Sequence, residues 1–158
     1  MENSRKIFVQ RTHKLLEQYA SFGANLPEEE QFEMTLLINA CVGLIFVGYQ
    51  DRRYKMPGEL IDSIGIPLDS ISTCKNGKND EPKTLKNVCK HIRNSIAHAR
   101  FEFINANKKI HKIKFIDQTT NGTEETFNMT LTCEQFKTLI EELYKLLTKC
   151  PEVKAEAK

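Results

Sequence analysis

A run of polar residues near the middle of the sequence shares one helical face and includes side chains that can move protons and bind phosphate. In the stretch "NVCKHIRNSIAHARFEF", polar residues recur at spacings of three and four, which stack their side chains along one stripe of an α-helix. The stripe holds Asn87, His91, Asn94 and His98, with Lys90 between them and Arg93 at its border. Because the solvent-exposed face of any amphipathic helix has a similar pattern, spacing alone leaves functional and structural interpretations open.

These residue types suit the cleavage of RNA without a metal ion. That reaction needs a base for the ribose 2′-hydroxyl, a cation on the phosphate and an acid for the leaving oxygen. His98 is the candidate base, because imidazole titrates near neutral pH, and a second, protonated copy would be the acid. Arg93 would hold the phosphate through its planar guanidinium, and Asn94 would orient the imidazole or a phosphate oxygen. Asn87, Lys90 and His91 are candidate substrate-binding residues.

One helix does not easily aim Arg93 and His98 at the same phosphate. The two residues are five positions apart, which is about 140° around an α-helix. Two such helices that cross at a dimer interface would bring the groups together. The chemistry therefore predicts a homodimer.

The cysteines and histidines do not indicate a metal site. The five cysteines occur singly and without a CxxC pair, which disfavours both a zinc site and a disulfide framework. Cys89, His91 and His98 share one helix, which does not offer tetrahedral closure around an ion. We therefore expect no metal and no cofactor, and the scattered cysteines fit a reducing cytoplasm.

Length and composition indicate one ordinary globular domain. The chain has 158 residues, of which 40% are hydrophobic and 28% charged, and its net charge of +2 gives no strong field for polyanions. We expect a single domain over residues 1–150 and a frayed tail over residues 151–158. Charges throughout the first residues argue against export. The longest uncharged run, Met34 to Gln50, falls short of a comfortable membrane span, so a buried core helix is expected.

Periodicity predicts four helices and three strands. Helical spacing covers residues 4–22, 25–48, 80–99 and 132–149. Alternation with period two covers "RFEFI", "KIHKIKFID" and "ETFNMTLT", which predict a small antiparallel meander. Residues 50–81 have no clear period and predict turns or loose chain. The expected fold is mainly α, with the three-stranded β-meander over residues 101–131 inserted between the third and last helices.

The string "IRNSIAHARFEF" resembles the signature of the HEPN family, the higher-eukaryote and prokaryote nucleotide-binding domains. That signature is an arginine, a polar residue, three further residues and a histidine, here Arg93, Asn94 and His98. The flanking segments are similar to a plasmid-borne branch that carries a small strand insert. The resemblance implies a bundle of about four helices that homodimerises through the motif helix and cleaves RNA without a metal. One branch is modified on a tyrosine two positions after the histidine, where this chain has Arg100.

The expected function is therefore that of an endoribonuclease, which leaves 2′,3′-cyclic phosphate and 5′-hydroxyl ends and does not act on DNA. Such an enzyme would serve as a toxin, an anti-phage effector or an RNA-processing factor, with RNA, a second copy and a protein inhibitor as partners and no membrane. The alternative is a non-catalytic module that binds RNA, a nucleotide or a protein through the same groove. A third hypothesis is a regulatory subunit of a larger defence system.

Overall fold

The computed structural model of the chain describes residues 4–27, 33–50, 56–106 and 109–149. The chain divides into two compact units. The first contains residues 1–55 and 141–158, and the second contains residues 56–140. The last helix contributes to both units, because its residues before Glu141 belong to the second.

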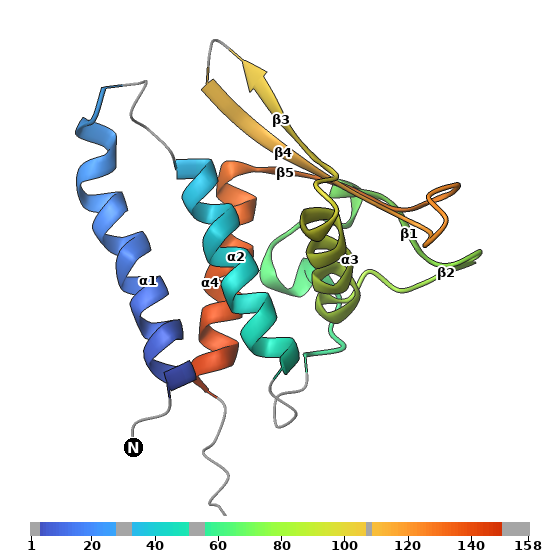
Figure 1. Cartoon of the computed structure of the whole chain (residues 1–158), viewed down its shortest axis with the longest axis horizontal. Helices are drawn as coiled ribbons and strands as arrows, with labels where there is room; N and C mark the ends of the chain where they lie inside the picture. The colour runs from blue at the N-terminus through green and yellow to red at the C-terminus, as the bar shows by residue number, and fades with distance from the viewer. Residues whose placement is uncertain (1–3, 28–32, 51–55, 107–108, 150–158) are drawn as a thin grey trace, which may run out of the picture. The chain divides into compact units, whose positions relative to one another are not determined.

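The first unit is helical where it is described. It contains α1 (Ser4–Phe22), a short 3₁₀ turn (Gly23–Asn25), α2 (Glu33–Gln50) and the C-terminal part of α4 (Cys133–Thr148). Helices α1 and α2 run side by side in opposite directions (Figure 1). The predicted bounds of the first helix are confirmed. The second was expected to begin near Asn25, but Asn25 lies in the 3₁₀ turn, and residues 28–32 lie outside the described part.

Close packing joins the helices of the first unit. A Cβ atom on Gly43 of α2 would lie 2.7 Å from the ring of Phe8 in α1, so glycine permits the close approach of the two helices. His13 of α1 stacks on Tyr144 of α4, with ring centroids 3.8 Å apart. Cys41 and Ile45 of α2 are fully buried, as expected of a core helix. No helix within the described ranges combines the length and the apolarity that crossing a membrane requires.

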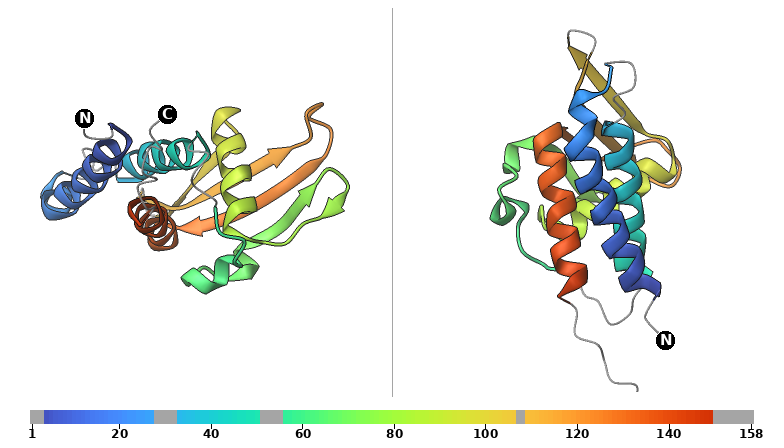
Figure 2. Two further views of the ribbon diagram at one scale, coloured as in Figure 1. Left: turned by 90° about the horizontal axis from the view of Figure 1, so that it is seen from below. Right: turned by 90° about the vertical axis from the view of Figure 1, so that its left-hand side faces the viewer.

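The second unit is built on an antiparallel sheet, in the strand order β2-β1-β5-β4-β3. Within the described residues its strands are β1 (Ile71–Asn76), β2 (Asn79–Asp80), β3 (Phe101–Ala106), β4 (Lys109–Gln118) and β5 (Glu125–Thr132). Helix α3 (Leu85–Ala97) lies across one face of this sheet and packs against β4 (Figure 2). Two 3₁₀ turns, Ile61–Ile64 and Leu68–Ser70, precede the sheet.

Alternating side chains of the two central strands form the core of this unit. Ile113 and Phe115 of β4 and Phe127 and Met129 of β5 are fully buried. Phe115 meets Phe136 of α4 edge to face, at a centroid distance of 5.5 Å. Each fully buried phenylalanine contributes about 1.5–3 kcal/mol through the hydrophobic effect. This core fixes the sheet face on which α3 rests.

The predicted mainly α fold with a three-stranded meander is wrong. The three expected strands are present, but β5 also pairs with β1, and the described part of the sheet has five strands. The two additional strands lie in the segment that was expected to be loose chain. In β1 the register shifts between Ile71 and Thr73, so burial does not alternate with period two. Both residues of β2 are exposed, so they give no apolar signal.

The turn between β1 and β2 does have a local sequence signal. Gly77 occupies the first position of the two-residue turn and has φ +61°. A tight hairpin turn with a glycine in this position is typical of antiparallel strands, because the glycine accepts a positive φ without strain. The "KNGKND" stretch was interpreted as a turn without its flanking strands. The structure therefore places the last part of the expected loose segment, Ile71–Asn76 and Asn79–Asp80, in the sheet.

Candidate functional site

The motif residues Arg93, Asn94 and His98 lie at the C-terminal end of α3, and hydrogen bonds fix both ends of this helix. At its start, the Thr84 hydroxyl accepts a hydrogen bond from the backbone N–H of Asn87 at 3.2 Å. The next free donors, the N–H groups of Leu85 and Lys86, reach the carbonyls of Glu59 and Pro57. The helix therefore begins at a defined residue, and the register of its polar stripe is fixed.

The helix ends immediately after the motif. His98 is the C-cap, and Ala99 follows with φ +53°, the one positive φ of a non-glycine among the described residues. The N–H of Arg100 donates to Ser95 at 2.7 Å and the N–H of Ala99 donates to Ile96 at 3.0 Å. This pair of bonds is a Schellman motif, in which glycine usually occupies the left-handed position. It turns the chain sharply from His98 into β3.

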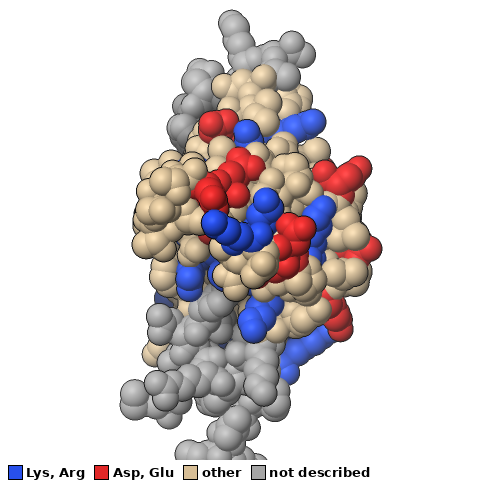
Figure 3. Space-filling view, turned by 90° about the vertical axis from the view of Figure 1, so that its right-hand side faces the viewer, with Lys and Arg blue, Asp and Glu red and all other residues tan. Residues whose placement is uncertain are grey.

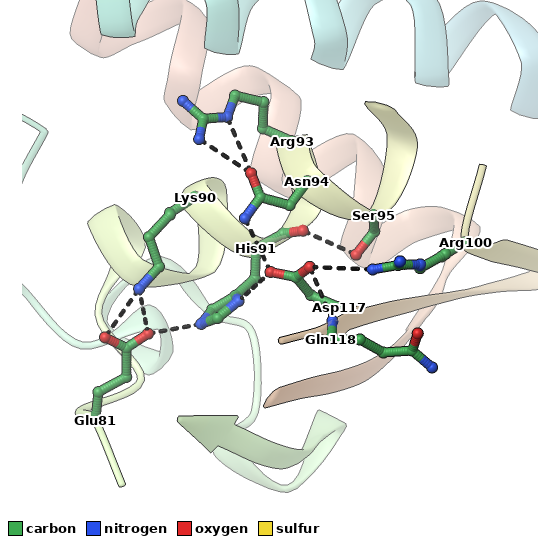
Figure 4. A network of polar contacts seen from close by, with 9 residues as sticks. All are labelled: Glu81, Lys90, His91, Arg93, Asn94, Ser95, Arg100, Asp117 and Gln118. Carbon is green, nitrogen blue, oxygen red and sulfur yellow. Dashed lines mark hydrogen bonds and ion pairs between the residues drawn. The ribbon is translucent and has the colours of Figure 1, made fainter. Parts of the chain in front are cut away.

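Arg93 and Asn94 form the first part of a polar network that extends to the sheet (Figure 4). Arg93 donates from Nε and Nη2 to Oδ1 of Asn94, at 3.3 and 3.0 Å. The amide nitrogen of Asn94 donates to Oδ2 of Asp117 in β4 at 3.0 Å. Because an asparagine amide has one donor end and one acceptor end, the carboxylate fixes which end faces the guanidinium. Asp117 therefore holds Arg93 through Asn94.

His91 lies at the centre of the network, between two carboxylates. Its Nδ1 lies 2.8 Å from Oδ2 of Asp117, and its Nε2 lies 2.6 Å from Oε1 of Glu81. The side chain is 3% exposed, and its ring stacks on Phe127 at a centroid distance of 4.7 Å. Each ring nitrogen of His91 therefore faces a carboxylate oxygen within hydrogen-bonding distance.

The two carboxylates are held in their charged forms. Burial raises the pKa of Glu81, but the hydrogen bonds from Lys90 and His91 outweigh burial and keep this pKa below its usual value. Burial also raises the pKa of Asp117, and the hydrogen bonds from His91 and Asn94 lower it by more. Lys90 contacts both oxygens of Glu81, at 2.7 and 3.0 Å. The negative charge of Glu81 is therefore paired with the positive charge of Lys90.

The structure brings four of the six predicted site residues into this network, namely Lys90, His91, Arg93 and Asn94. The other two lie apart from it. Asn87 donates from its side chain to the carbonyl of Pro82 at 2.9 Å, near the start of the helix. The His98 side chain is exposed and forms no hydrogen bond or ion pair with any described residue. Arg93 and His98 thus point to different surroundings within one chain.

Sequence reasoning missed Glu81 and Asp117. Asp117 alternates with Ile113 and Phe115, both fully buried, so period two places its carboxylate on the inner face of β4. A buried carboxylate needs hydrogen-bond donors or cations beside it. The inward position of Asp117 is therefore a signal that can be found in the sequence. Glu81 follows β2 in the segment whose strands were not predicted, so the sequence offered no comparable signal.

One group of side chains within the described ranges has the composition of a metal site. Cys74, Glu81 and His91 each offer one ligand atom, and these atoms all lie within 4.8 Å of one another. Burial, followed by the charge of Glu81, raises the pKa of the Cys74 thiol to about 11, so the free thiol keeps its proton. This group differs from the helix-only set that was considered from the sequence.

The surface offers no single-sign field over the face shown in Figure 3. Lysine and arginine side chains alternate there with aspartate and glutamate side chains. This mixture agrees with the totals of 23 basic and 21 acidic residues in the chain. A phosphate ligand of this face would meet individual cations rather than a broad basic patch.

Comparisons with known proteins assign the family. Neither the comparison with curated proteins nor that with solved structures finds a match. The family model described as HEPN pEK499 p136 matches residues 1–153, almost the whole chain. The chain therefore belongs to the HEPN pEK499 p136 family.

Proposed function

We propose that the chain is a metal-independent endoribonuclease that cleaves RNA through attack of the ribose 2′-hydroxyl. The observation that supports this most strongly is the placement of Arg93, Asn94 and His98 at the end of α3 in a HEPN family member. Arg93 is held by Asn94, whereas His98 is exposed at the helix end. A fixed cation and an accessible base are the two groups that the reaction needs first.

Each motif residue has a separate role in this mechanism. His98 removes the proton of the 2′-hydroxyl, whose oxygen attacks the adjacent phosphorus and expels the 5′-oxygen of the next nucleotide. Arg93 stabilises the charge on the non-bridging oxygens, and a protonated His98 of a second copy gives its proton to the leaving oxygen. Asn94 is a positioning residue, because its side chain contacts Arg93 and Asp117.

The remaining stripe residues have secondary roles. Asn87 and Lys90 lie on the helix at positions where they can add contacts to an RNA backbone. His91 is buried and both of its ring nitrogens face carboxylates, so we assign it to the support of Asp117 and Glu81 and not to the substrate. The active unit is a homodimer in which α3 of each copy contributes to a shared cleft.

Incubation of the purified chain with a structured RNA tests the proposal. We expect products with 2′,3′-cyclic phosphate and 5′-hydroxyl ends, in the presence of EDTA as well as in its absence. His98→Ala should reduce the rate by at least about 100-fold, the usual contribution of a general base. His111→Ala is the matched control, because His111 is an exposed histidine of β4 outside the motif, and it should cleave normally.

Three outcomes contradict this proposal. Cleavage that EDTA abolishes and that survives in His98→Ala belongs to a contaminating metal nuclease. Equal cleavage of an RNA and of the same sequence with 2′-deoxyribose at every position excludes attack by the 2′-hydroxyl. No product from folded dimers at high protein concentration favours the non-catalytic module that binds RNA, a nucleotide or a protein.

In the cell, we propose a toxin or anti-phage effector of the cytoplasm that a protein inhibitor restrains. Induced expression without that inhibitor should stop growth for the natural chain and not for His98→Ala at equal protein level. Growth that continues with both chains contradicts the toxin role and leaves RNA processing as the function to test. Arg100 at the position of the modified tyrosine indicates that the inhibitor does not act by modifying that side chain.

A further inference from the structure

A cluster in the second unit, separate from the exposed His98, gathers the three side-chain types that bind zinc most often. Cys74 belongs to β1, Glu81 follows β2, and His91 belongs to α3, so three segments converge. Their ligand atoms lie within 4.8 Å of one another. Cys74 is 7% exposed and the His91 side chain 3% exposed, so the cluster is largely shielded from water.

His91 is oriented as a metal-binding histidine is. Its Nδ1 lies 2.8 Å from the carboxylate of Asp117, while its Nε2 faces Glu81. Histidine ligands of metals usually donate one ring N–H to a carboxylate, which fixes the ring and makes the other nitrogen a better ligand. The stacking of the ring on Phe127, at an interplanar angle of 7°, further fixes its plane. The cluster thus includes the support of a metal site as well as its ligands.

We propose that Cys74, Glu81 and His91 bind one Zn²⁺ ion, whose fourth position is open to water. A thiolate and an imidazole favour zinc over magnesium or calcium, which prefer oxygen ligands. Three protein ligands leave one tetrahedral position for an exogenous ligand. The ion would join the β1–β2 hairpin to α3, the helix that carries Arg93 and His98.

This proposal is independent of RNA cleavage. In the absence of an ion, the hydrogen bonds of His91 already link α3 to Asp117 of β4 and to Glu81 after β2. Lys90 also remains bound to Glu81. Removal of the ion therefore leaves the motif helix in place, and EDTA is expected to lower stability without abolishing cleavage.

Cobalt titration of the full chain, after removal of metals by a chelator, tests the site. We expect one equivalent of Co²⁺ to bind with an absorption band from thiolate to cobalt, and one equivalent of Zn²⁺ to remove this band. Cys74→Ser should lose the band. Cys133→Ser is the matched control, because Cys133 lies in α4 outside the cluster, and it should keep the band at full intensity.

A second measurement uses the natural chain and does not depend on the folding of a variant. X-ray absorption at the zinc edge should show one sulfur and three nitrogen or oxygen neighbours. No bound Co²⁺, a thiolate band that persists in folded Cys74→Ser, or zinc without a sulfur neighbour would overturn the proposal. If Cys74→Ser does not fold, the zinc-edge spectrum of the natural chain decides.

Discussion

At the scale of the residue, one carboxylate organises the candidate site. Asp117 accepts hydrogen bonds from His91, Asn94 and the backbone N–H of Gln118, and the Nη1 atom of Arg100 lies 4.0 Å from its Oδ1. Its side chain is 5% exposed. Since Asn94 in turn holds Arg93, the position of the guanidinium depends on a residue that does not touch it. A change at Asp117 should therefore affect stability and catalysis together.

We expect Asp117→Asn to destabilise the metal-free chain by about 3 kcal/mol, because it removes a buried carboxylate that is hydrogen-bonded to His91, Asn94 and the backbone of Gln118. The amide also places donors against the donors of His91 and Asn94. Urea unfolding in the presence of a chelator measures the loss. Asp62→Asn is the control, since Asp62 is an exposed residue of a 3₁₀ turn, and it should change stability little. Equal stability of Asp117→Asn and the natural chain would contradict the network.

The same carboxylates predict acid sensitivity. The pKa values of Glu81 and Asp117 are lowered from 4.5 and 3.8, so the unfolded chain binds more protons than the folded one between the lowered and ordinary values. The free energy of unfolding should therefore fall as the pH drops below about 4.5, and the loss ends below the lowered values. Urea titrations across this range should give a smaller pH slope for Asp117→Asn. An identical slope would show that Asp117 does not contribute.

The motif residues were predictable from the sequence, whereas their partners were not. Arg93, Asn94 and His98 lie within six positions of one helix, so helical geometry alone places them at its end. Asp117 comes from a strand 23 positions after Asn94, and spacing on a helix does not report which strand will face it. The burial of His91 was missed for the same reason. The spacing of a polar stripe does not show that a sheet packs against that side of the helix.

At the scale of the element, the end of α3 decides where His98 points. The Schellman motif needs a left-handed residue after the C-cap, and the chain places Ala99 there with φ +53°. A left-handed conformation costs an ordinary L-residue about 1–2 kcal/mol relative to glycine. The chain therefore stores strain one residue after its candidate base.

We expect Ala99→Gly to stabilise the chain by about 1 kcal/mol, which corresponds to an increase in Tm of about 2–4 °C. Ala97→Gly is the matched control. Ala97 has helical geometry in the last turn of α3, where glycine costs about 0.5–1 kcal/mol, so this variant should melt lower. Thermal melts followed by circular dichroism compare the three chains. A decrease of Tm in both variants would show that position 99 is not left-handed in solution.

The elements that followed a regular period were predicted well. Helix α1 and strands β3, β4 and β5 lie close to the bounds that their periodicity indicated. Helix α4 also begins where Thr132 and Gln135 exchange hydrogen bonds in a capping box, a pattern of local sequence. Strand β1 was missed because a register shift breaks its alternation, and pairing with a distant strand, not local pattern, makes it a strand.

At the scale of the whole molecule, the proposed reaction requires two copies. Within one chain, Arg93 belongs to a network that reaches the sheet, while no described residue binds the His98 side chain. A cleft that receives Arg93 from one copy and His98 from the other removes this separation. Such an isologous interface makes two equivalent sites, because each copy gives both residues.

Mixing two inactive variants distinguishes a shared site from a site within one chain. Arg93→Ala and His98→Ala should each be inactive alone, whereas dimers that contain one copy of each keep one intact pairing of Arg93 with His98 across the interface. Random exchange makes half of the dimers mixed, and each keeps one of its two pairings of Arg93 with His98, so recovery cannot exceed about a quarter of natural activity. Because each mixed dimer also lacks the second His98 that acts as the acid, we expect a recovery below this limit and above the background.

The control mixture combines Arg93→Ala with the double variant Arg93→Ala, His98→Ala, in which no pairing across the interface is intact, so it should remain inactive. Sedimentation at the protein concentration of the assay establishes that dimers form. Full activity of a monomer, or no recovery in a mixture whose mixed dimers are demonstrated, would contradict a shared site. In the second case, the catalytic groups would have to come from a single chain, and the separation of Arg93 from His98 would then require a movement at the strained end of α3.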